Sequence, residues 1–456
     1  SLALLFLCAD AVFEETSYMS KNPMAASLAM LNRFSSSPIV HKLGLYKPAQ
    51  TAAKVAVREG FKAQALITRQ FRAAQKLVRP ERFQKFSKAS DAFDLNLTEE
   101  QQMIRDSAQR FAREALRPMA AKSDEHAAQP EGFDAQLAEL GFSQLSVPDK
   151  LGGSASEAAV VTGALLAEDL AYGDLGLALA ALAPIGVANA LTRWGSADQQ
   201  AKYLPAFAEP SPPKASLAIS EPRPLFDPNE LRTRATLDGD GFQLNGEKSL
   251  VPLVDTAEFF LVGASLVGKG PRMFVVDRGT AGLKTIADPA LGARAAGLGR
   301  IVFDDVRLPT RALLGDGVDV CDFDELVDLS RLALCALMVG VSQAVLDYTI
   351  PYVNDRIAFG EPVSHRQAVA FMVANIGIEL ESMRLLTLRA ASRAEQGLTF
   401  HREAYLARVL CVDKAMEIAT NGVQLLGGHG FIKEHPVERW YRDLMTLSAM
   451  EGGALL

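Results

Sequence analysis

The chain has 456 residues, enough for about three domains and a large buried core. Apolar residues make up 49% and charged residues 22%, an ordinary globular composition that excludes a disordered chain, a collagen and a coiled-coil rod. The net charge of −7 argues against nucleic acid as a partner. Four scattered cysteines without a CxxC pair disfavour a zinc knuckle or a disulfide framework, and they favour a reducing compartment.

Residues 1–95 are expected to form an N-terminal extension with a basic amphipathic helix. Residues 41–95 hold twelve Lys or Arg against four Asp or Glu. At about 100° per residue, six cations fall on one helical face and apolar side chains on the other. These cations are Lys54, Arg58, Lys62, Arg69, Arg72 and Lys76. Residues 54–76 either pack on the body with a solvated basic face or contact an anionic membrane surface or an acidic partner.

The pattern of residues 96–208 predicts a helical domain. Thr98 followed three residues later by Gln101 is typical of a capping box at a helix start. Helical periodicity continues through residues 103–115, and one Ala- and Leu-rich helical stretch is predicted over 158–190. The run Pro210-Ser-Pro-Pro213 ends this pattern.

Residues 209–320 have the texture of a small sheet domain or barrel. Alternating, β-branched segments occur at residues 233–237, 241–245, 259–263, 273–276 and 300–303. The run Asp238-Gly-Asp-Gly241 predicts a hairpin turn between the first two.

Residues 321–456 return to long helical patterns. Residues 332–341 are nearly all apolar, but polar residues interrupt the helix on both sides, so a buried bundle helix fits better than a membrane span. The run Glu451-Gly-Gly-Ala-Leu-Leu456 has no helix stop signal, and we expect the chain to be truncated there. We also expect the residues before Met19 or Met24 to be a remnant upstream of the natural start.

Five motifs in register resemble those of the acyl-CoA dehydrogenase family. The family patterns are S-E-P, N-G-x-K, F-x-x-V-x-V-P, Y-x-x-x-R-x-x-F-G-x-P and Q-x-x-G-G-x-G-F. Here they stand at Ser220–Pro222, Asn245–Lys248, Phe303–Pro309, Tyr352–Pro362 and Gln424–Phe431, the last followed by Arg442-Asp443. The resemblance covers about residues 95–451. It implies an α+β, mainly α fold with an N-terminal helical domain, a middle β-barrel-like domain and a C-terminal four-helix bundle.

The resemblance also implies a reaction, the FAD-dependent α,β-dehydrogenation of an acyl-CoA thioester to the trans-2-enoyl-CoA, as in fatty acid β-oxidation. Glu451 matches the family base that abstracts the α-proton, while the flavin ring nitrogen takes the β-hydride. Such a base is expected to be shielded from water. Relatives are homodimers or homotetramers in which two subunits touch each flavin, and an electron-transfer flavoprotein is the implied electron acceptor.

The remaining site residues are likewise carried over from the motifs. The implied cofactor-binding residues are Arg356, Phe359, Gln367, Gln424, Gly427, Gly428, Ser220 and Asp227. The implied substrate-binding residues are Asp328, Arg331 and Gly452, and the backbone N–H of Glu451 would help to bind the thioester oxygen. For Asp328 and Arg331, a plain i,i+3 ion pair is an equally good interpretation. No metal site is expected, because the spacing of His429 and His435 is not that of a ligand pair.

Three departures from the family pattern concern the flavin contacts. The loop after S-E-P reads Arg223-Pro-Leu-Phe226-Asp227, in which Phe226 replaces a hydroxyl and Arg223 offers a substitute positive charge. Leu250-Val-Pro252 replaces the family's W-x-T, and Gly453 replaces a threonine. These losses leave open a catalytically weakened member that acts as a binding or scaffold subunit. A monooxygenase or oxidase is disfavoured because Glu451 is retained. We expect a cytoplasmic location, with peripheral membrane contact through residues 54–76 as a further expectation.

Overall fold

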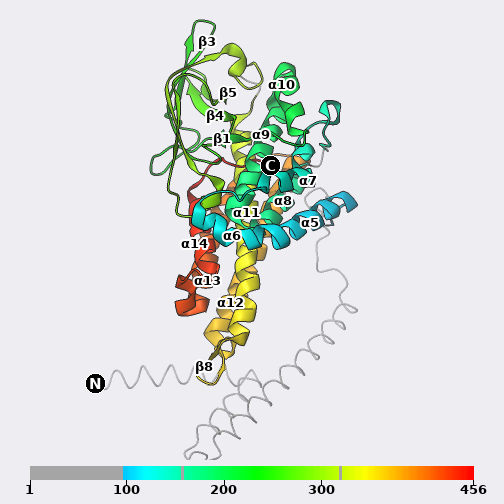
Figure 1. The fold of residues 1–456 in the computed structure, drawn as a ribbon, viewed down its shortest axis with the longest axis vertical. Helices are drawn as coiled ribbons and strands as arrows, with labels where there is room; N and C mark the ends of the chain where they lie inside the picture. The colour runs from blue at the N-terminus through cyan, green and yellow to red at the C-terminus, as the bar shows by residue number, and fades with distance from the viewer. Residues whose placement is uncertain (1–95, 156–158, 318–320) are drawn as a thin grey trace, which may run out of the picture. The chain divides into compact units, whose positions relative to one another are not determined.

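The computed structural model describes residues 96–155, 159–317 and 321–456. Their order of helices, strands and helices, labelled in Figure 1, confirms the predicted fold class. The basic helix predicted at residues 54–76 and the rest of the N-terminal extension lie outside the described residues.

The N-terminal helices begin as predicted. Helix α5 (Glu99–Phe111) starts with the capping box: Gln101 N donates to Thr98 Oγ1 and Thr98 N to Gln101 Oε1, each at 3.1 Å. A π-helical turn at Ala112–Leu116 leads into α6 (Arg117–His126), and α7 (Phe133–Leu140) follows. The helical stretch predicted over 158–190 is present, but it is divided into two helices at Asp174. These are α8 (Ala159–Gly173) and α9 (Leu175–Trp194), which are separate because Asp174 is extended and its side chain caps α9 by accepting from Leu177 N. Helix α10 (Ala197–Phe207) completes this layer.

The middle of the chain forms one twisted sheet in the strand order β1-β4-β2-β3-β7-β6, with β5 paired to β4. The strands are β1 (Ala215–Ala218), β2 (Arg234–Asp238), β3 (Gly241–Val251), β4 (Phe259–Leu266), β5 (Gly270–Asp277), β6 (Leu283–Ala287) and β7 (Gly299–Pro309). The predicted hairpin is present, since Asp238 pairs with Gly241 in an antiparallel register. The short strands β1 and β6 were not predicted. Strand β1 is buried on both faces and shows no alternation, and β6 has no buried residue to mark an inner face.

The C-terminal part is helical. Helix α11 (Phe323–Asp355) packs against α8, α12 (Gln367–Glu395) and α13 (His401–Leu426). A small hairpin of β8 (Ile357–Ala358) and β9 (Glu361–Pro362) joins α11 to α12. A 3₁₀ turn at Gly427–Phe431 leads into α14 (Val437–Ala449). In Figure 1 the β8 hairpin lies at the end of the bundle away from the sheet.

Two of the described helices, α9 and α11, are long and apolar enough to cross a membrane by length and composition alone. In their most apolar windows, however, 78% and 83% of the residues are buried inside the protein. This burial is typical of core helices, as predicted for residues 332–341.

Candidate functional site

Glu451 follows α14 and its C-cap Met450, where side chains from α11, α13 and the segment after β1 meet. Its side chain is 16% exposed, so it is shielded from water. Arg331 Nε from α11 lies 3.1 Å from Oε2 of Glu451, and Arg408 Nε from α13 lies 3.9 Å from Oε1. Arg408 also donates to the carbonyls of Leu447 and Met450, which fixes the end of α14. The predicted base, Glu451, is therefore an ion-paired carboxylate, and the sequence motif gave no sign of this pairing.

Ser220 connects the end of β1 to the backbone of Glu451. Its Oγ donates to Glu451 O at 2.6 Å and accepts from Glu451 N at 2.9 Å. Sequence reasoning placed Ser220 at the cofactor and gave the Glu451 N–H to a thioester oxygen. In the structure both groups are engaged with each other, so Ser220 fixes the backbone that carries the candidate base.

A buried ion pair holds the turn that carries Ser220. Lys248 on β3 is fully buried, and its Nζ donates to Ile219 O and to Glu221 Oε1, each at 3.0 Å. Burial lowers the pKa of Lys248 to about 8, although Glu221 opposes the shift. Burial acts to raise the pKa of Glu221, but Lys248 and the backbone N–H groups of Thr233 and Arg232 outweigh it and lower that pKa. The S-E-P and N-G-x-K motifs thus meet as one structural unit, a role that sequence reasoning missed.

Asp328 and Arg331 form the i,i+3 ion pair that the sequence left as one of two interpretations. Arg331 Nη1 lies 3.8 Å from Asp328 Oδ1, and His401 Nδ1 lies 2.6 Å from Asp328 Oδ2. Burial raises the pKa of Asp328, while His401 and Arg331 oppose the shift. Arg331 therefore lies between two carboxylates, those of Asp328 and Glu451.

Two of the departures from the family pattern meet beside Glu451, because Gly453 packs against Pro252. An ideal Cβ built on Gly453 would lie 3.3 Å from Pro252 Cγ and 2.9 Å from Met450 Cε, and φ of Gly453 is +86°. A threonine at this position would therefore be strained here. Arg223, proposed as a substitute charge, donates to the carbonyls of Asp227 and Glu230 and stacks over Phe226. Its guanidinium is thus used to fold its own loop, and Asp227 is exposed.

A second set of predicted residues lies at the far end of the bundle. Arg356, Phe359, Gln367, Gln424, Gly427 and Gly428 are all exposed there. Gly427 has φ +57° and ψ −130°, a conformation that favours glycine, and an ideal Cβ on it or on Gly428 would meet open space. Tyr352 joins the two motifs, because its Oη lies 2.8 Å from His429 Nδ1 and donates to Leu426 O.

The predicted cofactor residues thus fall into two sets separated by α14. This helix has 13 residues, which corresponds to a length of about 20 Å. Ser220 and Glu451 lie at its C-terminal end, whereas Gln424 and Gly427 precede its N-terminal end. The chain alone therefore does not bring the two sets together.

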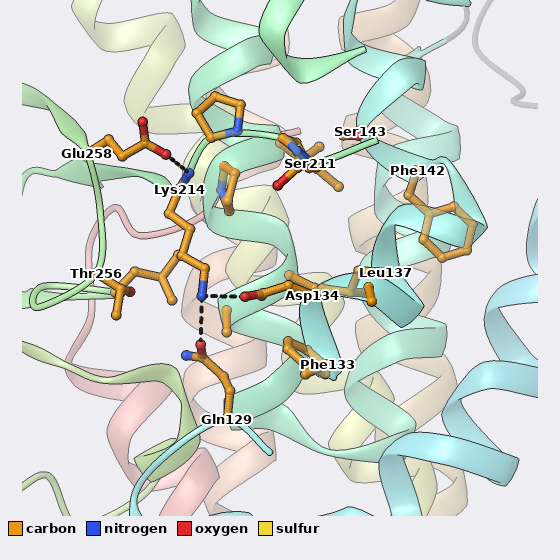
Figure 2. A pocket seen from close by; sticks show the side chains of 18 of the residues that line it. Gln129, Phe133, Asp134, Leu137, Phe142, Ser143, Ser211, Lys214, Thr256 and Glu258 are labelled. Carbon is orange, nitrogen blue, oxygen red and sulfur yellow. Dashed lines mark hydrogen bonds and ion pairs between the residues drawn. The ribbon is translucent and has the colours of Figure 1, made fainter. Parts of the chain in front are cut away.

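A cavity of about 460 Å³ opens elsewhere, between α7, α9 and the loop that leads to β1. Figure 2 shows its polar rim, where Lys214 Nζ reaches Asp134 at 2.7 Å and Gln129 at 3.4 Å. No predicted site residue lines this cavity. Despite its size, the cavity is therefore separate from the residues around Glu451.

Known proteins match nearly all of the described chain. The N-terminal, middle and C-terminal domain models of the acyl-CoA dehydrogenase family match residues 98–210, 216–306 and 316–454. The mitochondrial short-chain specific acyl-CoA dehydrogenase of Bos taurus is 32% identical over 371 residues, covering 78% of this chain and 88% of that protein. Butyryl-CoA dehydrogenase from Megasphaera elsdenii is similar in structure, with a TM-score of 0.72 and 27% identity over 79% of this chain and 96% of that one. PigA, solved as an FAD complex, has a TM-score of 0.72 and 25% identity over the same shares.

These matches define the class of protein. The chain belongs to the acyl-CoA dehydrogenase family, whose curated members are oxidoreductases named for this activity.

Proposed function

We propose that this protein is an FAD-dependent acyl-CoA dehydrogenase in which Glu451 removes the α-proton of the acyl-CoA thioester. The observation that carries the proposal is the placement of Glu451, a shielded carboxylate whose backbone and side chain are both fixed. Ser220 fixes its backbone, and the guanidinium of Arg331 fixes its side chain. Preorganisation of this kind keeps a catalytic group within reach of one substrate atom.

The predicted cofactor residues at the far end of the bundle have the chemistry needed to bind a dinucleotide such as FAD. Gly427 and Gly428 leave room for close approach of a ligand, Gln424 offers an exposed amide, and Arg356 offers an exposed guanidinium suited to a pyrophosphate. FAD would supply the acceptor for the β-hydride. The chain's own residues would bind it, orient the thioester against Glu451 and hold the abstracted proton on the Glu451 carboxylate.

The two separated sets of residues support an oligomer in which one subunit completes the site of another. The far end of the bundle exposes apolar side chains: Phe359 is 95% exposed and Phe431 78%. Further along α12, Phe371 and Ile378 are 59% and 63% exposed. Exposed apolar surface of this extent marks an interaction site. We therefore propose a homodimer or homotetramer in which Arg356 and Gln424 serve the cofactor beside a neighbour's Glu451.

The test is a comparison of wild type with Glu451→Gln. Glutamine keeps the volume and the hydrogen bonding but cannot accept a proton, so turnover should fall by about 10² to 10⁴. Flavin content and acyl-CoA binding should stay near wild type. Because the bovine relative is short-chain specific, butyryl-CoA is the first substrate to try. Near-normal turnover by the variant would show that the base is wrongly assigned.

A catalytically weakened member acting as a binding or scaffold subunit is the second candidate. Pro252 and Gly453 favour it, because neither has a hydroxyl to offer a flavin. Purified protein that carries no flavin and shows no absorbance change with acyl-CoA would support this candidate over the enzyme.

An electron-transfer flavoprotein as acceptor and a cytoplasmic location, with membrane contact through residues 54–76, complete the proposal. The contact with anionic lipid is supported by the six cations that residues 54–76 would place on one face of a helix. Flotation of the full chain with anionic and with neutral vesicles tests it. Equal binding to both, or binding that salt does not weaken, would contradict it.

A further inference from the structure

We propose that Asp328 and His401 are positioning residues that set how tightly Arg331 holds the Glu451 carboxylate. The inference rests on the proposed function, since it concerns the availability of the base. Asp328 and Arg331 come from α11, His401 is the first residue of α13, and Glu451 follows α14. Together they form a chain of ionic contacts that runs from the exposed His401 through Asp328 and Arg331 to Glu451.

The central fact is that Arg331 is shared between two carboxylates. Its Nε lies 3.1 Å from Glu451 Oε2, and its Nη1 lies 3.8 Å from Asp328 Oδ1. Asp328 Oδ1 is buried and accepts no hydrogen bond from any described residue. It therefore has the capacity to accept one from the guanidinium. A small movement of Arg331 toward Asp328 would weaken its bond to Glu451 and leave that carboxylate freer to accept a proton.

His401 controls the strength of this competition. Its Nδ1 lies 2.6 Å from the other oxygen of Asp328, and its side chain is 72% exposed, whereas that of Asp328 is 4% exposed. Of these two groups, solvent therefore reaches the imidazole and not the carboxylate. A neutral His401 leaves Asp328 its full charge, which draws Arg331 away from Glu451. A protonated His401 offsets that charge, and Arg331 stays on Glu451.

The other charged groups near these four residues cannot replace His401 in setting how Arg331 is shared. The charge of Asp324, one turn before Asp328 on α11, acts with burial to raise the pKa of Asp328. Arg408 on α13 approaches Glu451 at 3.9 Å, but it is bound to the carbonyls at the end of α14. Among the described residues, Arg331 is therefore the cation on Glu451 that also has a second carboxylate within reach.

The first test is the pH profile of kcat for His401→Asn. Asparagine can still donate to Asp328 but cannot take up a proton. In wild type, kcat should rise with pH between about pH 6 and 8. In His401→Asn that rise should disappear, with kcat at pH 6 close to the wild-type value at pH 8. His126→Asn, at an exposed histidine ending α6, is the matched control and should keep the wild-type profile.

The second test is Asp328→Asn, which removes the competitor for Arg331. We expect kcat to fall about tenfold at pH 8, equivalent to about 1.4 kcal/mol, and to stay near the wild-type value at pH 6, where a protonated His401 already offsets Asp328; KM for acyl-CoA should stay within twofold. A raised KM with an unchanged kcat would mean that Asp328 binds substrate instead, and it would overturn the proposal. Retention of the wild-type pH rise by His401→Asn would also overturn it.

A spectroscopic readout keeps the inference separate from the proposed function. The infrared difference between wild type and Glu451→Gln isolates the Glu451 carboxylate band, which needs no turnover. This band should differ between pH 6 and pH 8 in wild type and stay fixed in the His401→Asn background. A band that stays fixed in wild type refutes the positioning role. Normal turnover by Glu451→Gln refutes the proposed function whatever the band does.

Discussion

Replacing Lys248 with methionine should be among the most damaging single changes in the sheet. The side chain is fully buried, and Met leaves the Glu221 carboxylate, itself 3% exposed, without its cation. Removing one partner of a buried pair costs about 3–5 kcal/mol. Glu221 would still accept from the backbone N–H groups of Arg232 and Thr233, so we expect the lower end of that range.

The pH dependence of stability tests a different property of Lys248, the cost of burying its charge. Burial lowers the pKa of Lys248 from 10.5 to about 8. Between these values the unfolded chain keeps a proton that the folded chain has released, so the free energy of unfolding rises with pH by about 3 kcal/mol. That gain is present above pH 10.5 and is lost as the pH falls through 8. Lys248→Met should abolish it.

Guanidinium denaturation of the full chain between pH 7 and 10.5 is the assay, with Glu221→Gln and the double variant completing a cycle. The double variant should be less damaged than the sum of the single ones, because the uncompensated charge is gone. A cost below 1 kcal/mol for Lys248→Met, or strict additivity in the cycle, would refute the role of the pair.

Three further changes test other parts of the site. Ser220→Ala removes both hydrogen bonds to the Glu451 backbone, so it should lower the free energy of unfolding by about 1 kcal/mol and kcat about tenfold. The control is Ser216→Ala, at a buried hydroxyl without a hydrogen bond among the described residues. Thermal melting and steady-state kinetics should show neither effect for this control. Arg356→Ala should lower flavin content and shift gel filtration toward smaller species together, and the exposed Arg307→Ala on β7 should leave both unchanged. Burial raises the pKa of Asp443 from 3.8 to about 7, so between these values the folded chain holds a proton that the unfolded chain releases, and stability should fall as the pH rises from about 4 to 7. Asp443→Asn should flatten this fall. An unchanged pH dependence of the melting temperature would contradict this.

Local signals in the sequence were sufficient for most of the architecture. The capping box at Thr98 and the turn before Gly241 depend on side chains within a few residues of each other, and both were predicted. The break at Asp174 was missed because its apolar neighbours continue the helical pattern on both sides. Strand β1 was missed because it is four buried residues with no alternation to detect.

The ion pairs of the site could not be read from local pattern. Arg331 and Glu451 are 120 residues apart, and His401 is 73 residues from Asp328. Only the packing of α11 against α13 and α14 brings them together. The motifs indicated which residues matter near Glu451, but the contacts of Ser220 and Lys248 became clear only once β1, β3 and the last segment were placed side by side.

The separation of the two residue sets by α14 has a consequence for mixed assemblies. If a site takes Glu451 from one subunit and Arg356 from another, a subunit damaged at Arg356 spoils its neighbour's site rather than its own. An Arg356→Ala subunit paired with a Glu451→Gln subunit would concentrate both defects in one site and leave the other intact. When the two variants are unfolded and refolded together, each mixed dimer would then have up to half the activity of a wild-type dimer.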